Sequence, residues 1–123
     1  MQQSRQKMKR LCFLALAASL GAVVIAGPSY AASADAQRLY QQGTQALGEG
    51  HTEDAVADYD AALSFDPEFT QALKRRGFAY LVLNRPFAAL DDLDRALTIE
   101  PKDVEALTLR GSVRSEEHTS ELQ

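Results

Sequence analysis

The chain has 123 residues, 46% of them hydrophobic and 24% charged, which suits one small domain of ordinary soluble composition. Its net charge of −4 is unevenly distributed, because residues 1–31 contain four cations and no acid. The remainder has nine cations and 17 acids, a net charge of −8. We therefore expect no nucleic-acid partner and no binding to anionic membranes, since both draw on Lys and Arg.

The N-terminal segment is typical of a secretory signal peptide. Its cations lie within residues 1–10, an apolar run of 16 residues follows at 11–26, and small residues come next. A helix that crosses a bilayer needs about 20 apolar residues, so a retained membrane anchor is not expected. We predict cleavage after Ala31, with Ala34 and Ala36 as alternatives.

Removal of residues 1–31 has two consequences. The mature protein is expected to be exported, to the periplasm if the source is a Gram-negative bacterium and otherwise into the medium. Cys12 leaves with the signal peptide, so neither a disulfide nor a thiol nucleophile is expected in the mature chain. Residues 32–35 are predicted to be a short linker.

The mature chain contains an internal repeat with a period of 34 residues. Residues 36–69 align with 70–103 without a gap, and ten positions are identical. A third copy starts at 104–113, where Arg110 and Gly111 match Arg76 and Gly77. A fixed period of this length predicts an architecture of stacked repeats.

Each copy is predicted to contain two helices. Gly50 ends the first helix, and Asn84 takes its place in the second copy, because both residues tolerate the left-handed backbone. Thr52 is predicted to cap the following helix, and Pro86 occupies an early helical position where its missing N–H costs nothing. The acids of the second helices are predicted to lie on solvated outer faces; they are Asp58, Asp60, Asp91, Asp92 and Asp94.

The two copies resemble tetratricopeptide repeats (TPRs), whose pattern combines large, small and aromatic residues with a closing proline. Some structural repeat residues match the TPR pattern and others are expected where two helices cross. Together they are Leu39, Gly43, Ala55, Tyr59, Ala62, Pro67, Leu73, Gly77, Tyr80, Ala89, Ala96, Pro101, Leu107 and Gly111. Leu39 and Leu73 replace the usual Trp, and Leu93 replaces an aromatic residue. The resemblance implies an all-α solenoid with two complete copies and the first helix of a third.

The 34-residue period fails at Arg114. Arg114 and Ser115 stand where the earlier copies place residues on the buried face, and burial of an unpaired arginine is costly. The last ten residues, RSEEHTSELQ at 114–123, resemble a translated adapter used in short-read sequencing, so we predict a non-native tail. The alternative is a native acidic tail. Resequencing the source gene checks this, because a native frame encoding SEEHTSEL would contradict it.

Stacked helix pairs curve, and the first helix of each pair lines the concave side. The resemblance therefore implies a protein or peptide partner on that face and a scaffold or assembly role. The predicted contact residues are Tyr40, Thr44, Lys74, Arg75, Phe78 and Leu109. Phe78 and Lys74 lie one turn apart and are expected to receive an apolar side chain and an acidic group of an extended peptide. Alternatively, residues 74–76 form a solvated basic face while Phe78 packs against a neighbouring repeat.

Some family members hold a peptide's terminal carboxylate with Lys, Asn and Arg along this groove. Phe78 stands where the Asn would be needed, so this specialised function is not expected here.

Neither catalysis, a metal site nor a cofactor is expected. His51 lies in a turn near acids, but the mature chain offers no Cys and no second His outside the predicted tail to complete a metal site. Phosphate-binding and nucleophile motifs are likewise missing from the sequence. A different possibility remains open: the chain is the N-terminal module of a longer exported protein, whose enzymatic or assembly domain lies beyond this fragment.

Overall fold

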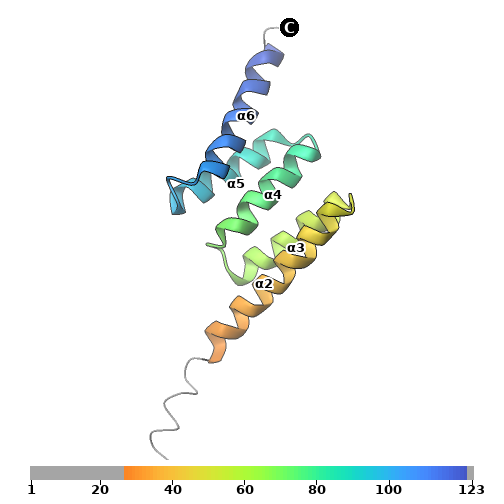
Figure 1. Cartoon of the computed structure of the whole chain (residues 1–123), viewed down its shortest axis with the longest axis vertical. Coiled ribbons are helices and arrows are strands. Elements are labelled where there is room, and N and C mark those ends of the chain that lie inside the picture. The colour runs from red at the N-terminus through yellow and green to blue at the C-terminus, as the bar shows by residue number, and fades with distance from the viewer. Residues whose placement is uncertain (1–26, 122–123) are drawn as a thin grey trace, which may run out of the picture. The chain divides into compact units, whose positions relative to one another are not determined.

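The computed structural model describes residues 27–121 (Figure 1), so most of the predicted signal peptide lies outside the described residues. Within this range the chain forms five helices and no strand, which confirms the predicted all-α fold. The helices are α2 (Gly27–Gly48), α3 (Thr52–Phe65), α4 (Thr70–Val82), α5 (Pro86–Ile99) and α6 (Val104–Glu121). None of these helices is both long enough and apolar enough to cross a membrane.

The first and last described helices, with 22 and 18 residues, are longer than the three helices between them. Helix α2 begins at Gly27 and therefore includes residues 32–35, which the sequence predicted as a linker, and the alternative cleavage positions. Helix α6 continues from the third repeat copy into the predicted tail as far as Glu121. Arg114 and Ser115 are exposed on α6.

The turn within each repeat follows the same backbone course. Gly50 has φ +85° and Asn84 has φ 57°, so both adopt the predicted left-handed conformation that closes a helix. The next N–H bridges back in both copies, from His51 to the Ala46 carbonyl and from Arg85 to the Tyr80 carbonyl, each at 2.8 Å. Equivalent residues 34 positions apart therefore make equivalent turns.

The start of α3 differs by one residue from the sequence prediction. Thr52 is the first helical residue and does not act as a side-chain cap; the cap position belongs to His51, whose carbonyl accepts from the Ala55 N–H at 3.0 Å. The backbone bridge to His51 closes the turn early, which leaves Thr52 inside the helix. Pro86 opens α5, as predicted.

Small residues allow the two helices of each repeat to cross closely. A Cβ added at Gly43 would lie 2.9 Å from a ring carbon of Tyr59 and 3.2 Å from the Ala55 carbonyl oxygen. At Gly77 the nearest atom to such a Cβ would be Cγ of Leu93, at 3.3 Å. Alanines are fully buried on the facing helices, so backbone separation here is set by the absence of side chains.

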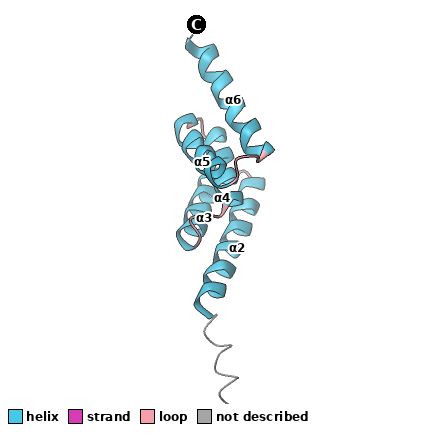
Figure 2. Ribbon diagram, turned by 90° about the vertical axis from the view of Figure 1, so that its left-hand side faces the viewer, coloured by secondary structure: helices cyan, strands magenta, loops and turns pink. Residues whose placement is uncertain are grey.

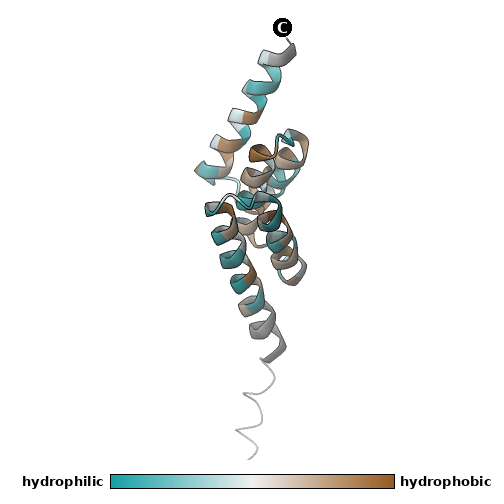
Figure 3. Ribbon diagram, turned by 90° about the vertical axis from the view of Figure 1, so that its right-hand side faces the viewer, coloured by the Kyte–Doolittle hydropathy of each residue, from teal (hydrophilic) through white to brown (hydrophobic). Residues whose placement is uncertain are grey.

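The first helices of the repeat copies, α2, α4 and α6, form one layer, and the second helices, α3 and α5, form the other. Figure 2 shows α3 and α5 on the left and α2 and α6 on the right, with α4 in the middle of the view. Figure 3 shows hydrophobic (brown) and hydrophilic (teal) residues interspersed along the helices that it colours. The core lies between the layers and contains Ala55, Tyr59, Ala62, Leu63, Ala72, Leu73, Leu93, Ala96, Leu97, Ala106 and Val113.

Candidate functional site

The predicted contact residues lie on α2, α4 and α6, the first helices of the three repeat copies. Arg75 and Phe78 are exposed on α4, and 40% of the Phe78 surface is open to solvent. Tyr40, Thr44, Lys74 and Leu109 are half-buried. Among the predicted contact residues, Phe78 is thus the most exposed large apolar side chain.

An aromatic cluster connects α2, α3 and the residue that precedes α4. The Tyr40 ring centroid lies 5.1 Å from that of Phe69 and 5.9 Å from that of Tyr59, both tilted. The Thr44 hydroxyl donates to the Tyr40 carbonyl at 2.9 Å and lies 3.2 Å from the Tyr59 hydroxyl. Burial raises the pKa of Tyr59 above its usual 10.0. We call Tyr40, Tyr59 and Phe69 the aromatic junction.

An ionic cluster occupies the same position between the second repeat and α6. The Lys74 ammonium donates to Asp103 and to Glu105, each at 2.8 Å, and 13% of its side chain is exposed. Burial lowers the pKa of Lys74, but the hydrogen bonds with Asp103 and Glu105 outweigh it, so the pKa lies above 10.5. Hydrogen bonds from Lys74 and the Ala106 N–H lower the pKa of Asp103. We call Lys74, Asp103 and Glu105 the ionic junction.

These contacts change how Lys74 enters the candidate site. The sequence predicts that its ammonium receives an acidic group from a partner. In the structure the ammonium already holds two carboxylates, so a partner's acid would have to displace one of them. The charge of Lys74 on this face is therefore neutralised by carboxylates of its own chain. The neighbouring Arg75 is an exposed cation.

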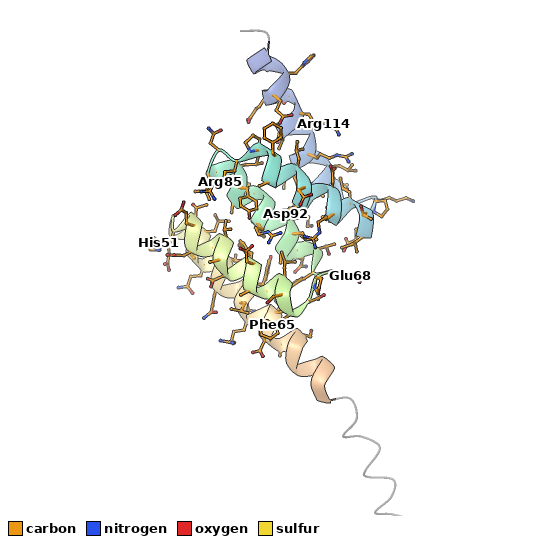
Figure 4. All side chains as sticks on the ribbon, turned by 180° about the vertical axis from the view of Figure 1, so that it is seen from behind. His51, Phe65, Glu68, Arg85, Asp92 and Arg114 are labelled. Atoms are coloured by element: carbon orange, nitrogen blue, oxygen red, sulfur yellow. The ribbon has the colours of Figure 1, made fainter. Side chains whose placement is uncertain are left out.

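Arg76 and Asp92 correct two further predictions. Asp92 was expected on a solvated face, but it is 1% exposed and accepts from Arg76 at 2.7 Å and 2.5 Å (Figure 4). Arg76 also donates to Asp60 at 2.5 Å, so it takes no part in a solvated basic face. Burial raises the pKa of Asp92, and the Arg76 guanidinium opposes this by stabilising the charged form. The pair is therefore part of the core.

A shallow depression lies where α3, α4 and α5 meet their connecting turns. Its volume is about 310 Å³, and its lining includes Phe69, Gln71, Lys74 and Glu100. The Thr70 hydroxyl donates to Glu100 at 2.6 Å beside it. The depression borders the aromatic and ionic junctions, so the surface between them is recessed.

The turn at His51 shows no catalytic arrangement. The His51 side chain is exposed, with Nδ1 3.6 Å from a Glu49 carboxylate oxygen, and Figure 4 shows it at the outer end of α3. Among residues 27–121, no three His, Cys, Asp or Glu side chains are grouped so that they could hold a metal ion.

Comparisons with known proteins identify the fold. No protein family and no curated protein matches the chain by sequence. Among solved structures, the first TPR of Spaghetti (RPAP3) superposes with a TM-score of 0.68 at 24% identity, over 72% of each chain. The Arabidopsis OM64 TPR domain gives 0.69 at 24% identity, over 72% of this chain and 73% of that one.

A third TPR domain, that of Sgt2 from Aspergillus fumigatus, superposes with a TM-score of 0.65 at 25% identity. It covers 68% of this chain and 56% of that one. The fold is that of TPR domains. The predicted helical repeat is therefore confirmed.

Proposed function

We propose that this TPR fold binds a partner protein or peptide along the face formed by α2, α4 and α6. The fold supports the proposal, and one of the similar structures, the first TPR of Spaghetti (RPAP3), is bound to an HSP90 peptide, SRMEEVD. The observation that carries it is the exposed Phe78 at the middle of the face, next to the exposed Arg75. A scaffold or assembly role follows from such binding, and no catalytic role is proposed.

The ion pairs of Lys74 favour a segment whose main contact is an apolar anchor. Lys74 is neutralised by two carboxylates of its own chain, so an acidic peptide gains little from it. Removing a carboxylate from Lys74 would also leave a half-buried charge without one of its partners. An apolar side chain on Phe78 needs no such exchange, and we propose it as the main contact.

Selection from a random peptide library tests this proposal. Peptides selected on the wild-type chain should lose binding at least about tenfold in Phe78→Ala, because a central aromatic contact typically dominates such an interface. Phe87→Ala is the matched control, since Phe87 is 78% exposed on α5, a helix of the other layer. Circular dichroism should show the same helix content in both variants. An equal loss of peptide binding in the two variants, or no loss of binding in either, would contradict the proposal.

We also propose that the module is exported. Support comes from the basic, apolar and small-residue segments at 1–31. Expression of the complete chain with its N-terminus intact, followed by mass measurement of the product outside the cytoplasm, tests this. The expected product begins at Ala32, or at Asp35 or Gln37 if an alternative position is used; an uncleaved cytoplasmic product would contradict the proposal.

A further inference from the structure

The two carboxylates that hold the Lys74 ammonium differ in how firmly each is fixed. Only 10% of the Asp103 side chain is exposed, and it also accepts from the Ala106 N–H at 3.0 Å, at the start of α6. The Glu105 side chain is 52% exposed. Within the described part of the chain, its carboxylate accepts a hydrogen bond from Lys74 alone. Glu105 is therefore the carboxylate that can leave Lys74 without disturbing the start of α6.

The first repeat shows that a neutral residue fits the position of Glu105. Glu105 is the second residue of α6, and Gln71, 34 positions earlier, is the second residue of α4. Gln71 is exposed, as Glu105 is. The start of a first helix in this repeat therefore does not require an acid at this position.

Lys74 is within reach of a segment that binds Phe78. The two residues are four positions apart on α4, which is about 6 Å along the helix axis. Alternate side chains of an extended peptide lie about 6.6 Å apart on the same side of its backbone. A segment with an apolar residue on Phe78 therefore brings the side chain two positions away to Lys74, which also lines the shallow depression.

We propose that Glu105 is a specificity-determining residue, which excludes acidic segments by holding the place at Lys74 that a partner's carboxylate would take. The inference rests on the proposed function, because it needs a partner anchored on Phe78. The ionic junction contains one cation and two anions, a net charge of −1, so a further carboxylate is repelled. Without the charge of Glu105 the net charge is zero, and a partner's carboxylate restores the native arrangement.

Peptide selection on a charge-neutral variant tests this role of Glu105. Library selection on Glu105→Gln should enrich Asp and Glu two positions from the apolar anchor, whereas selection on the wild type should deplete them. An acidic peptide obtained in this way should bind Glu105→Gln at least about tenfold more tightly than it binds the wild type, as expected for one charged hydrogen bond. Its Asn or Gln analogue should bind both chains equally, which also shows that Glu105→Gln is folded.

Two further variants separate a local effect from a change in overall charge. Lys74→Met combined with Glu105→Gln should remove the advantage of the acidic peptide, because the receiving ammonium is gone. Glu68→Gln is the matched control, since Glu68 is exposed and lines the same depression. It removes the same charge but leaves both carboxylates on Lys74, so it should select peptides as the wild type does. Arg75 is present in every chain, so its charge does not affect the comparison.

The outcomes separate this inference from the proposed function. Failure to select peptides whose binding depends on Phe78 would overturn both. Peptides that depend on Phe78 but have the same acid content on wild type and Glu105→Gln would overturn the role of Glu105 alone. The same conclusion would follow from an acidic preference that survives Lys74→Met, or from one that Glu68→Gln produces equally well.

Discussion

The aromatic junction and the ionic junction occupy the same place in two successive steps of the repeat. Tyr40 is equivalent to Lys74, and Phe69 is equivalent to Asp103, so a ring pair in one step becomes an ion pair in the next. The helix crossing beneath them changes less, since Gly43 and Gly77 both admit a close neighbour. The repeat thus specifies where contacts form, while their chemistry is free to differ.

The difference has an energetic meaning. Aromatic burial depends little on salt or pH, whereas an ion pair near the surface is screened by salt and contributes little in most proteins. We therefore expect the first step to supply most of the stability and the second step to respond to solution conditions. Variants in the two junctions can test this division.

The largest expected effect is at the centre of the aromatic junction. Tyr59 is fully buried, and Tyr59→Ala should lower the free energy of unfolding by about 3–5 kcal/mol, because it removes a large core side chain. Urea denaturation followed by circular dichroism measures the change. Lys74→Ala in the ionic junction is the comparison, and an equal loss in the two variants would show that the junctions do not differ.

The equivalent glycines should give a graded series. Gly43→Ala should destabilise by about 1–3 kcal/mol, because the new methyl group meets both Tyr59 and a backbone carbonyl. Gly77→Ala should cost less, since the nearest atom is a leucine carbon at 3.3 Å. Gly111→Ala faces open space and should stabilise by up to about 1 kcal/mol through helix propensity. Thermal unfolding ranks the three, and destabilisation by Gly111→Ala would contradict the ordering.

The smallest effect concerns the ionic junction and pH. The pKa of Asp103 is lowered, so its contribution exists above about pH 3.8 and is lost as the pH falls through the folded value. The pKa of Lys74 is raised, so its contribution exists below about pH 10.5 and is lost as the pH rises through the folded value.

The measurement is the difference in unfolding free energy between wild type and Lys74→Met across this range. It should be largest at neutral pH, at most about 1 kcal/mol, and should shrink toward both extremes and in high salt. Tyr59→Phe is a control, because it removes a titrating group from the other junction. It should leave the pH dependence of the unfolding free energy below neutral pH unchanged. A pH-independent difference would rule out an electrostatic origin.

The fold could be predicted because its main determinants are local and periodic. Gly50 and Asn84 mark the turns through backbone conformation alone, and Pro86 opens a helix for the same reason. The one-residue error at Thr52 arose because a backbone bridge, not a side chain, fixes where α3 begins.

The candidate site was less predictable because charges pair across helices. Asp92 stands beside Asp91 and Asp94 in the sequence, and nothing local distinguishes the buried acid from the exposed ones. The recurrence of Arg76 as Arg110, and of Asp60 as Asp94, was a usable signal that these residues pair. The partners of Lys74 lie about 30 residues away, in a turn and in the next helix, so its neutralised state required the structure.

Arg76 donates three hydrogen bonds, two to Asp92 and one to Asp60. These bonds bear on how the molecule would respond to a pulling force. One guanidinium fastens α4 to carboxylates on both α3 and α5, so force applied to Phe78 from the groove is carried into the outer layer at two places. At α6 the equivalent Arg110 donates to Asp94 of α5. We therefore expect α4 to be held more firmly than α6 when the chain is pulled.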